Sequence, residues 1–347
     1  MAGMRSRIAS LVSFDFSHAD WPDAVRGTLV TAAVTAIPVL AGAPEKAIPL
    51  SIGAAFIAIS EAGEAFGRRW RTMLWTTAAL MIAVGLGAML SNVYLLAIGV
   101  TAIVAFICGG VGFLGPRFAV GGLLSLVLFA IYVGVPVPLD GALTSAALVG
   151  LGGIIQAVSS VAMGLLRGQH RLETPDGQAL PPLIALWRGD HTFLGHGIRL
   201  AVVMAIATTI SESLSVPHPY WLPMSVAWMS KPDLNGTVVR VLHRLVGTVL
   251  GLVIAYLVVI LFRPSGNGFL PLSLLGVALA IAFIWSNYAV AVTGVTLWVV
   301  SLFAMVGDPV VSTMDARLLA TAAAAGLVLL AAWAPNELPR RKPKLSS

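Results

Sequence analysis

The chain has 347 residues, of which 58% are hydrophobic and only 10% are charged, and its mean hydropathy is +0.92. Because a soluble domain carries about 25% charged residues, this composition excludes a soluble globular protein and indicates an integral membrane protein. The apolar runs are long and continuous instead of alternating, which excludes a β-barrel and favours an all-α bundle. The single cysteine, Cys108, excludes an intramolecular disulfide and a cysteine-based metal site.

Residues 1–23 are expected to form a short amphipathic segment at the membrane surface, anchored by Phe14, Phe16 and Trp21. Two arginines precede its apolar residues, but aspartates follow at once and no small-residue cleavage site is present. The segment is therefore a poor signal peptide.

Charges, prolines and glycine or asparagine turns divide the remaining chain into about twelve apolar runs. Each run is expected to be a transmembrane helix, since a span needs about 20 residues. The runs lie near 24–43, 47–66, 72–90, 93–109, 118–134, 142–166, 198–216, 219–231, 238–262, 269–285, 288–306 and 315–334.

The distribution of positive charge predicts that both termini are cytoplasmic. With twelve spans and an internal N-terminus, 18 of the 21 lysines and arginines fall on the inner side. Only Lys46, Arg263 and Arg317 fall on the outer side. This asymmetry is the one that the positive-inside rule requires. The basic tail 336–347 would anchor the C-terminus at the inner surface of the membrane.

Landmarks that recur at a nearly constant offset indicate an internal duplication. Arg26 and Arg199 are 173 residues apart, Pro49 and Pro223 are 174 apart, and Arg68 and Arg240 are 172 apart. We therefore expect two parallel six-helix repeats, 24–166 and 198–335, joined by a cytoplasmic linker, 167–197. An even number of spans gives both repeats one orientation, with a site or pathway between them.

The second and eighth predicted spans differ from the others, because each opens with prolines and becomes charged early. The charges are Glu61 and Glu64 in the second span, and Lys231 and Asp233 at the end of the eighth. Interrupted segments at matching positions of two repeats are typical of transport sites. We hypothesise that Glu61 or Glu64 pairs with Lys231 or Arg240 across the twofold axis and that these carboxylates couple transport to protons. The alternative is that all of them are solvated helix ends at the cytoplasmic surface.

A polar stripe follows one face of the helix predicted at 238–262. It contains Thr237, Arg240, Arg244, Gly247, Thr248 and Gly251. The two arginines could bind a carboxylate in two-point geometry or extend to lipid headgroups as topology anchors. In the first repeat, Arg68 occupies the position that corresponds to Arg240. The small residues of the stripe, Gly247, Thr248 and Gly251, suit close helix packing.

Two further groups of residues are candidates. Trp228, with Trp221 and Tyr220, could stack an aromatic substrate, or could belong to the aromatic belt at the membrane surface. Glu212, close to His218, could release protons on the outer side, or could be an isolated interfacial acid.

The same region resembles a known family. The residues Pro232-Asp233, Gly236-Thr237, Arg240, Arg244, Gly247-Thr248 and Gly251, preceded by Tyr220-Trp221, are similar to the motif of the fusaric-acid-resistance-like (FUSC) membrane proteins, which include the aromatic acid exporters. The resemblance implies export of small organic acids across a bacterial inner membrane. Larger exporters of this family carry a substantial soluble domain in the middle, for which the linker of about 30 residues has no room.

We therefore expect an inner-membrane transporter that exports small amphipathic organic anions, such as aromatic carboxylic acids, with proton coupling. The alternatives are a passive organic-anion channel, as a fainter resemblance to plant aluminium-activated malate transporters suggests, or a membrane scaffold without transport. The expected partners are the lipid bilayer and the anion, with a second copy of the chain or a periplasmic adaptor as further candidates. We expect no enzyme activity, cofactor, metal or nucleic acid, because no nucleophile with a partnered base and no nucleotide loop is present.

Overall fold

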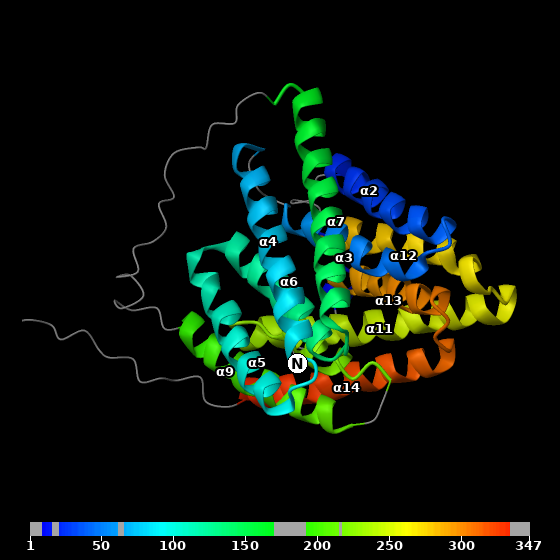
Figure 1. Cartoon of the computed structure of the whole chain (residues 1–347). Helices are drawn as coiled ribbons and strands as arrows, with labels where there is room; N and C mark the ends of the chain where they lie inside the picture. Colours follow the sequence, from blue (N-terminus) through cyan, green and yellow to red (C-terminus); the bar gives the residue numbers. More distant parts are fainter. Residues whose placement is uncertain (1–8, 16–20, 62–65, 170–191, 215–216, 334–347) are drawn as a thin grey trace, which may run out of the picture.

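The computed structural model describes residues 9–15, 21–61, 66–169, 192–214 and 217–333, and its elements there are helical, without a strand (Figure 1). The all-α class is thereby confirmed. The α-helices are α2 (Trp21–Leu40), α3 (Pro44–Ser60), α4 (Phe66–Leu90), α5 (Tyr94–Gly110), α6 (Pro116–Val133), α7 (Leu139–Leu166), α9 (Thr192–Ser213), α10 (Trp221–Met229), α11 (Leu234–Phe262), α12 (Leu270–Phe283), α13 (Tyr288–Met305) and α14 (Val310–Trp333), with 3₁₀ turns η1 (Val111–Leu114) and η2 (Gly266–Phe269).

Ten helical segments are long and apolar enough to cross a membrane, with α5 counted together with η1 and α12 together with η2. The exceptions are α3, with 17 residues, and α10, with nine. Length and composition thus support ten of the twelve predicted spans. The two short helices are the second and eighth, where the sequence places prolines and early charges.

The shortness of α10 follows from the residues after it. Ser230 leaves the helix with an extended backbone, and Pro232 cannot continue it. Asp233 then caps the next helix, because its Oδ2 accepts a hydrogen bond from the Gly236 amide at 2.6 Å. All nine residues of α10 are buried, so this helix runs through the protein interior.

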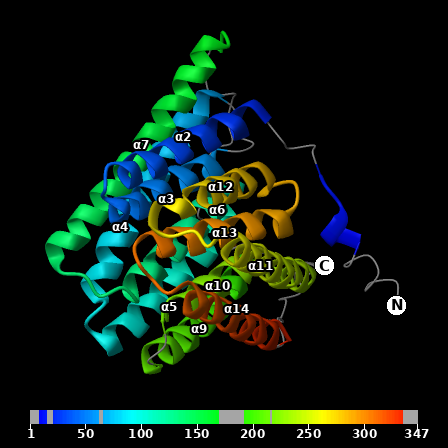
Figure 2. The same cartoon turned by 90° about the vertical axis from the view of Figure 1, so that its right-hand side faces the viewer.

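Helices α3 and α10 are enclosed by longer neighbours in both halves of the chain. Helix α3 packs on α7, and α10 packs on α14 and α6. Helix α5 against α9 and α2 against α12 join the halves. Figure 1 shows α4, α6 and α7 running across the direction of α11, α13 and α14, and Figure 2 shows α10 near α14.

The N-terminal residues 9–15 attach to the turn between α12 and α13. The Asn287 side-chain amide donates to the carbonyls of Leu11 at 2.9 Å and Ser13 at 3.0 Å, and Phe14 packs edge-on against Phe283. The tail 336–347 and most of the linker, 170–191, lie outside the described residues.

Candidate functional site: a cavity lined by two buried arginines

A cavity of about 580 Å³ lies between the two halves, a volume typical of small-molecule sites. Residues of α3, α6, α7, α10, α11, α12, α13 and α14 line it, and most of them are apolar or aromatic. The lining also includes three exposed residues, Glu45, Lys46 and Asp140, which we call the mouth. The aromatic lining consists of Phe56, Tyr132, Tyr220, Trp221, Trp228, Tyr288, Trp298 and Phe303.

Arg244, from the polar stripe of α11, reaches this cavity and is only 1% exposed. Its Nη1 donates to the Tyr288 hydroxyl at 3.1 Å, and its guanidinium carbon lies 5.8 Å from the centre of the Trp228 ring. Among the residues that the structure describes, its Nε and Nη2 have no hydrogen-bond partner. Arg244 therefore presents unused donors in a buried setting.

Arg317, on α14, lines the same cavity and is also 1% exposed. Its guanidinium carbon lies 5.2 Å from the centre of the Trp221 ring, and its Nε and Nη1 lack hydrogen-bond partners within the described part of the chain. In the sequence, Arg317 was counted only as a positive charge on the outer side, so it was not predicted as a residue of the substrate site. A charge eight residues into an apolar helix was the signal that could have identified it.

Arg244 and Arg317, which we call the guanidinium pair, are suited to hold an anion. Burying a cation without a counter-charge is costly, and the unmade hydrogen bonds add to that cost. A carboxylate entering the cavity would supply charge and two acceptor oxygens to a planar fork of donors. The aromatic rings around the pair would contact the apolar part of such a ligand.

Two other predicted residues of the substrate site contribute in different ways. Trp228 lines the cavity and packs edge-on against Phe56, with ring centres 6.2 Å apart. Arg240 does not line it; its guanidinium carbon lies 3.3 Å from the centre of the Tyr288 ring, and its Nε donates to the Trp228 carbonyl at 3.3 Å. Arg240 therefore holds two of the residues that form the cavity wall.

Four further candidates lie away from the cavity. Thr237 donates to the Asp233 carbonyl at 2.8 Å, at the start of α11. Lys231 lines a separate cavity of about 80 Å³. Arg68, near the start of α4, is half-buried and lines neither cavity. Thr248 is fully buried within α11.

The glycines beside Thr248 serve helix packing. A Cβ on Gly247 would lie 2.4 Å from the Ala289 carbonyl oxygen, and one on Gly251 would lie 2.7 Å from the Thr296 Cβ. Since both neighbours belong to α13, the small end of the stripe is where α11 and α13 approach closely.

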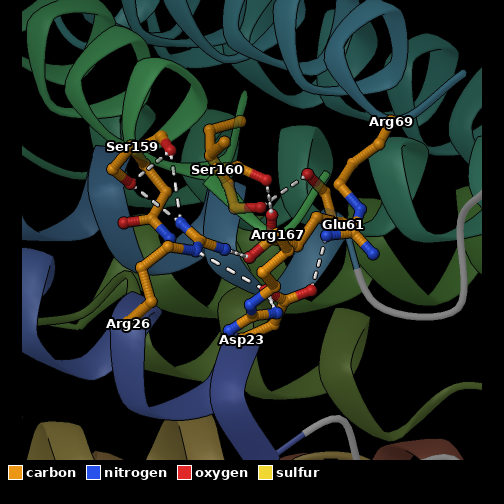
Figure 3. Close-up of polar contacts among 10 residues, drawn as sticks. Asp23, Arg26, Glu61, Arg69, Ser159, Ser160 and Arg167 are labelled. Atoms are coloured by element: carbon orange, nitrogen blue, oxygen red, sulfur yellow. Dashed lines mark hydrogen bonds and ion pairs between the residues drawn. The ribbon is translucent and has the colours of Figure 1, made fainter. Parts of the chain in front are cut away.

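Glu61 takes part in a different contact from the one predicted. Its carboxylate, 3% exposed, pairs with Arg26 and accepts a hydrogen bond from the Ser160 hydroxyl at 2.6 Å (Figure 3). The hypothesis that Glu61 pairs with Lys231 or Arg240 is therefore wrong, because Glu61 forms its ion pair with Arg26 of α2. Glu64 lies outside the described residues.

The two remaining acidic candidates do not approach the cavity. Asp233 is exposed and caps α11. Glu212 is half-buried near the end of α9, and the predicted pair with His218 is wrong, since His218 pairs with Asp308 at 3.4 Å. Burial lowers the pKa of His218, and Asp308 partly opposes that effect.

Asp23, Arg26, Glu61, Arg69 and Arg167 form what we call the ion-pair cluster (Figure 3). Asp23 contacts Arg167 at 3.2 Å and also pairs with Arg69, and it lies 3.7 Å from Arg26. The cluster joins the start of α2, the residue after α3, the start of α4 and the residue after α7. Four helix ends are thus held together by charge.

An arginine in the second half makes a comparable contact. Arg199 Nη2 donates to the carbonyls of Lys231 at 2.6 Å and Pro232 at 3.1 Å. Arg26 and Arg199 therefore both bind the segment that follows a short buried helix. The acceptor is a carboxylate in the first half and backbone carbonyls in the second.

Comparison with known proteins supports the resemblance found in the sequence. Residues 204–331 match the model of the fusaric acid resistance protein-like family. This region contains α10, α11 and Arg317, and therefore both members of the guanidinium pair.

Curated relatives are similar over parts of the chain. An uncharacterised protein, ORF2, of Neisseria gonorrhoeae is 30% identical over 157 residues, which are 45% of this chain and 36% of the relative. Inner membrane protein YccS of Escherichia coli is 30% identical over 113 residues, 33% of this chain and 16% of the relative. Uncharacterized protein YhfK of Escherichia coli is 31% identical over 99 residues, 28% of this chain and 14% of the relative. The match thus spans about a third or less of each relative's length, and no solved structure matches the chain.

Proposed function

We propose that this chain, which contains a fusaric acid resistance protein-like region at residues 204–331, is an inner-membrane transporter that exports small amphipathic organic anions such as aromatic carboxylic acids. The observation that carries the proposal is the guanidinium pair. Two buried cations with unused donors face one aromatic cavity of about 580 Å³.

The carboxylate binds at Arg244. The guanidinium Nη1 of this residue donates a hydrogen bond to the Tyr288 hydroxyl, and its Nε and Nη2 are available to donate to the ligand. The apolar body of the substrate lies against Trp228 and Phe56. Arg240 acts as a positioning residue, because it contacts both Tyr288 and Trp228.

Access to the site alternates between the two sides of the membrane. The mouth belongs to the side that the positive-inside rule makes periplasmic. Towards the other side, the Phe56–Trp228 contact and Arg240 close the cavity. Helices α3 and α10, short and buried, supply the moving element, and their opening would admit an anion from the cytoplasm.

Proton coupling operates through Glu61. A proton taken up on its carboxylate removes the charge that holds Arg26, so that the four helix ends of the ion-pair cluster separate more easily. The buried position of Glu61 suits this role, because a low dielectric makes the Glu61–Arg26 pair sensitive to the loss of one charge.

The two halves are proposed to be repeats of one six-helix unit. Similar packing supports this: α3 lies on α7 as α10 lies on α14, and α4 lies on α6 and α7 as α11 lies on α13 and α14. A twofold relation would place the cavity on the axis between the halves.

Flux from liposomes tests the proposal. Purified protein is reconstituted with a panel of aromatic and aliphatic carboxylates, and release is followed with and without a pH gradient for wild type, Arg244→Gln and Glu61→Gln. We expect gradient-driven release that Arg244→Gln abolishes and Glu61→Gln uncouples. Release independent of the gradient would identify an anion channel, and no release of any acid would contradict transport.

A further inference from the structure

The guanidinium pair places two positive charges around one cavity without an internal counter-charge. Among the described residues, neither Arg244 nor Arg317 forms an ion pair with a carboxylate. The acids that line the cavity, Glu45 and Asp140, are exposed at the mouth. A bound monocarboxylate would compensate only one of two buried charges, and the other would keep its desolvation cost.

The two arginines contact different tryptophans of the cavity wall. Arg317 lies over Trp221 and Arg244 lies near Trp228, at 5.2 Å and 5.8 Å from the ring centres. These tryptophans are seven residues apart on α10, which at 1.5 Å per residue is about 10 Å along the helix. Contacts to rings two helical turns apart suit two acidic groups, one for each arginine, better than a single carboxylate.

The cavity wall beside these tryptophans suits an extended apolar body. Met224, which lies between the tryptophans on α10, lines the cavity, as do Ile284, just after α12, and Val292, on α13. An apolar body can therefore pack against these side chains while the two arginines bind its acidic groups.

We propose that the occupant of this cavity is an elongated dianion, a flat apolar body with an acidic group at each end, bound by Arg244 at one end and Arg317 at the other. The inference rests on the proposed function and specifies its substrate class. Each guanidinium group forms charge-assisted hydrogen bonds with one acidic group, and both buried charges are compensated.

Three acids of similar body test this geometry in nanodiscs of zwitterionic lipid: benzoate, terephthalate with carboxylates at opposite ends, and phthalate with adjacent carboxylates. We expect terephthalate to bind about 10- to 100-fold more tightly than benzoate, since a hydrogen bond to a charged group contributes about 1.5–3 kcal/mol. Phthalate should gain little over benzoate. Arg317→Gln should reduce terephthalate binding to the level at which wild type binds benzoate.

The outcomes separate this inference from the proposed function. Equal affinity for benzoate and terephthalate would overturn the dianion and leave carboxylate transport intact, whereas binding of none of the three would contradict both. If Arg317→Gln does not fold, the wild-type ranking of the three acids decides alone. Cardiolipin, whose two phosphates share the same chemistry, is added in a separate arm; stabilisation by cardiolipin through both arginines, without binding of terephthalate, would identify a lipid site and overturn the proposal.

Discussion

Arg244 lies in surroundings that penalise its charge while the cavity is empty, because it is buried and two of its nitrogens lack hydrogen-bond partners in the described ranges. Replacing it with Gln should therefore raise the thermal stability of the ligand-free protein by a few degrees, while anion binding falls by about tenfold or more. Thermal unfolding in detergent and equilibrium binding measure the two effects.

The exposed Arg71, which lies near a tryptophan at the start of α4, gives a matched control, and Arg71→Gln should change neither quantity. A structural role for Arg244 would give the opposite sign, with Arg244→Gln less stable than wild type.

The Arg26–Glu61 pair should behave as a coupled unit. Removing Arg26 leaves the buried Glu61 carboxylate without its ion-pair partner, and removing Glu61 leaves Arg26 with only the 3.7 Å ion pair to Asp23 among the described residues; breaking a buried pair in this way typically costs about 3–5 kcal/mol. The double variant Arg26→Gln, Glu61→Gln should lose less stability than the sum of the two single variants. Additive losses in chemical unfolding would show that the two side chains do not interact.

Residue by residue, the sequence indicated some of the candidate site and missed the rest for physical reasons. Arg244 and Trp228 were identified because helical periodicity places the stripe on one face, and Trp228 lies in the buried short helix. Arg317 was missed because its charge was assigned only to loop topology. The partner of Glu61 was wrong because it depends on how α2 packs, which local spacing does not encode.

Among the elements, α11 and α13 depend on glycine for their close approach. A Cβ on Gly247 would lie 2.4 Å from the Ala289 carbonyl oxygen, so Gly247→Ala should cost about 1–3 kcal/mol through overpacking. Gly326, on α14, has open space around its missing side chain, and Gly326→Ala should be neutral or slightly stabilising. Equal unfolding midpoints for the two variants would contradict this packing.

Sequence patterns identified the helices themselves well, because long apolar runs between polar turns have few alternatives in a membrane. They also singled out the second and eighth runs, whose prolines and early charges correspond to α3 and α10. What they did not indicate is that all nine residues of α10 are buried, since burial depends on the packing of α6, α9, α11 and α14 around it and not on hydropathy.

For the whole molecule, the proposed orientation places the mouth on the periplasmic side of the membrane. In a Cys108→Ser background, the cysteine introduced by Lys46→Cys should react with a membrane-impermeant maleimide in intact cells. A cysteine at Arg71 should react only after the membrane is opened. The reverse pattern would contradict the orientation derived from the positive-inside rule.

Locating a bound acid tests the central claim most directly. Diffraction data collected at the iodine absorption edge from the protein with an iodinated aromatic carboxylate should place the iodine within the cavity, with the carboxylate at Arg244 and none of it bound in Arg244→Gln. Iodine density on the lipid-facing surface alone, or undiminished density in the variant, would contradict an anion site built on Arg244 and Arg317.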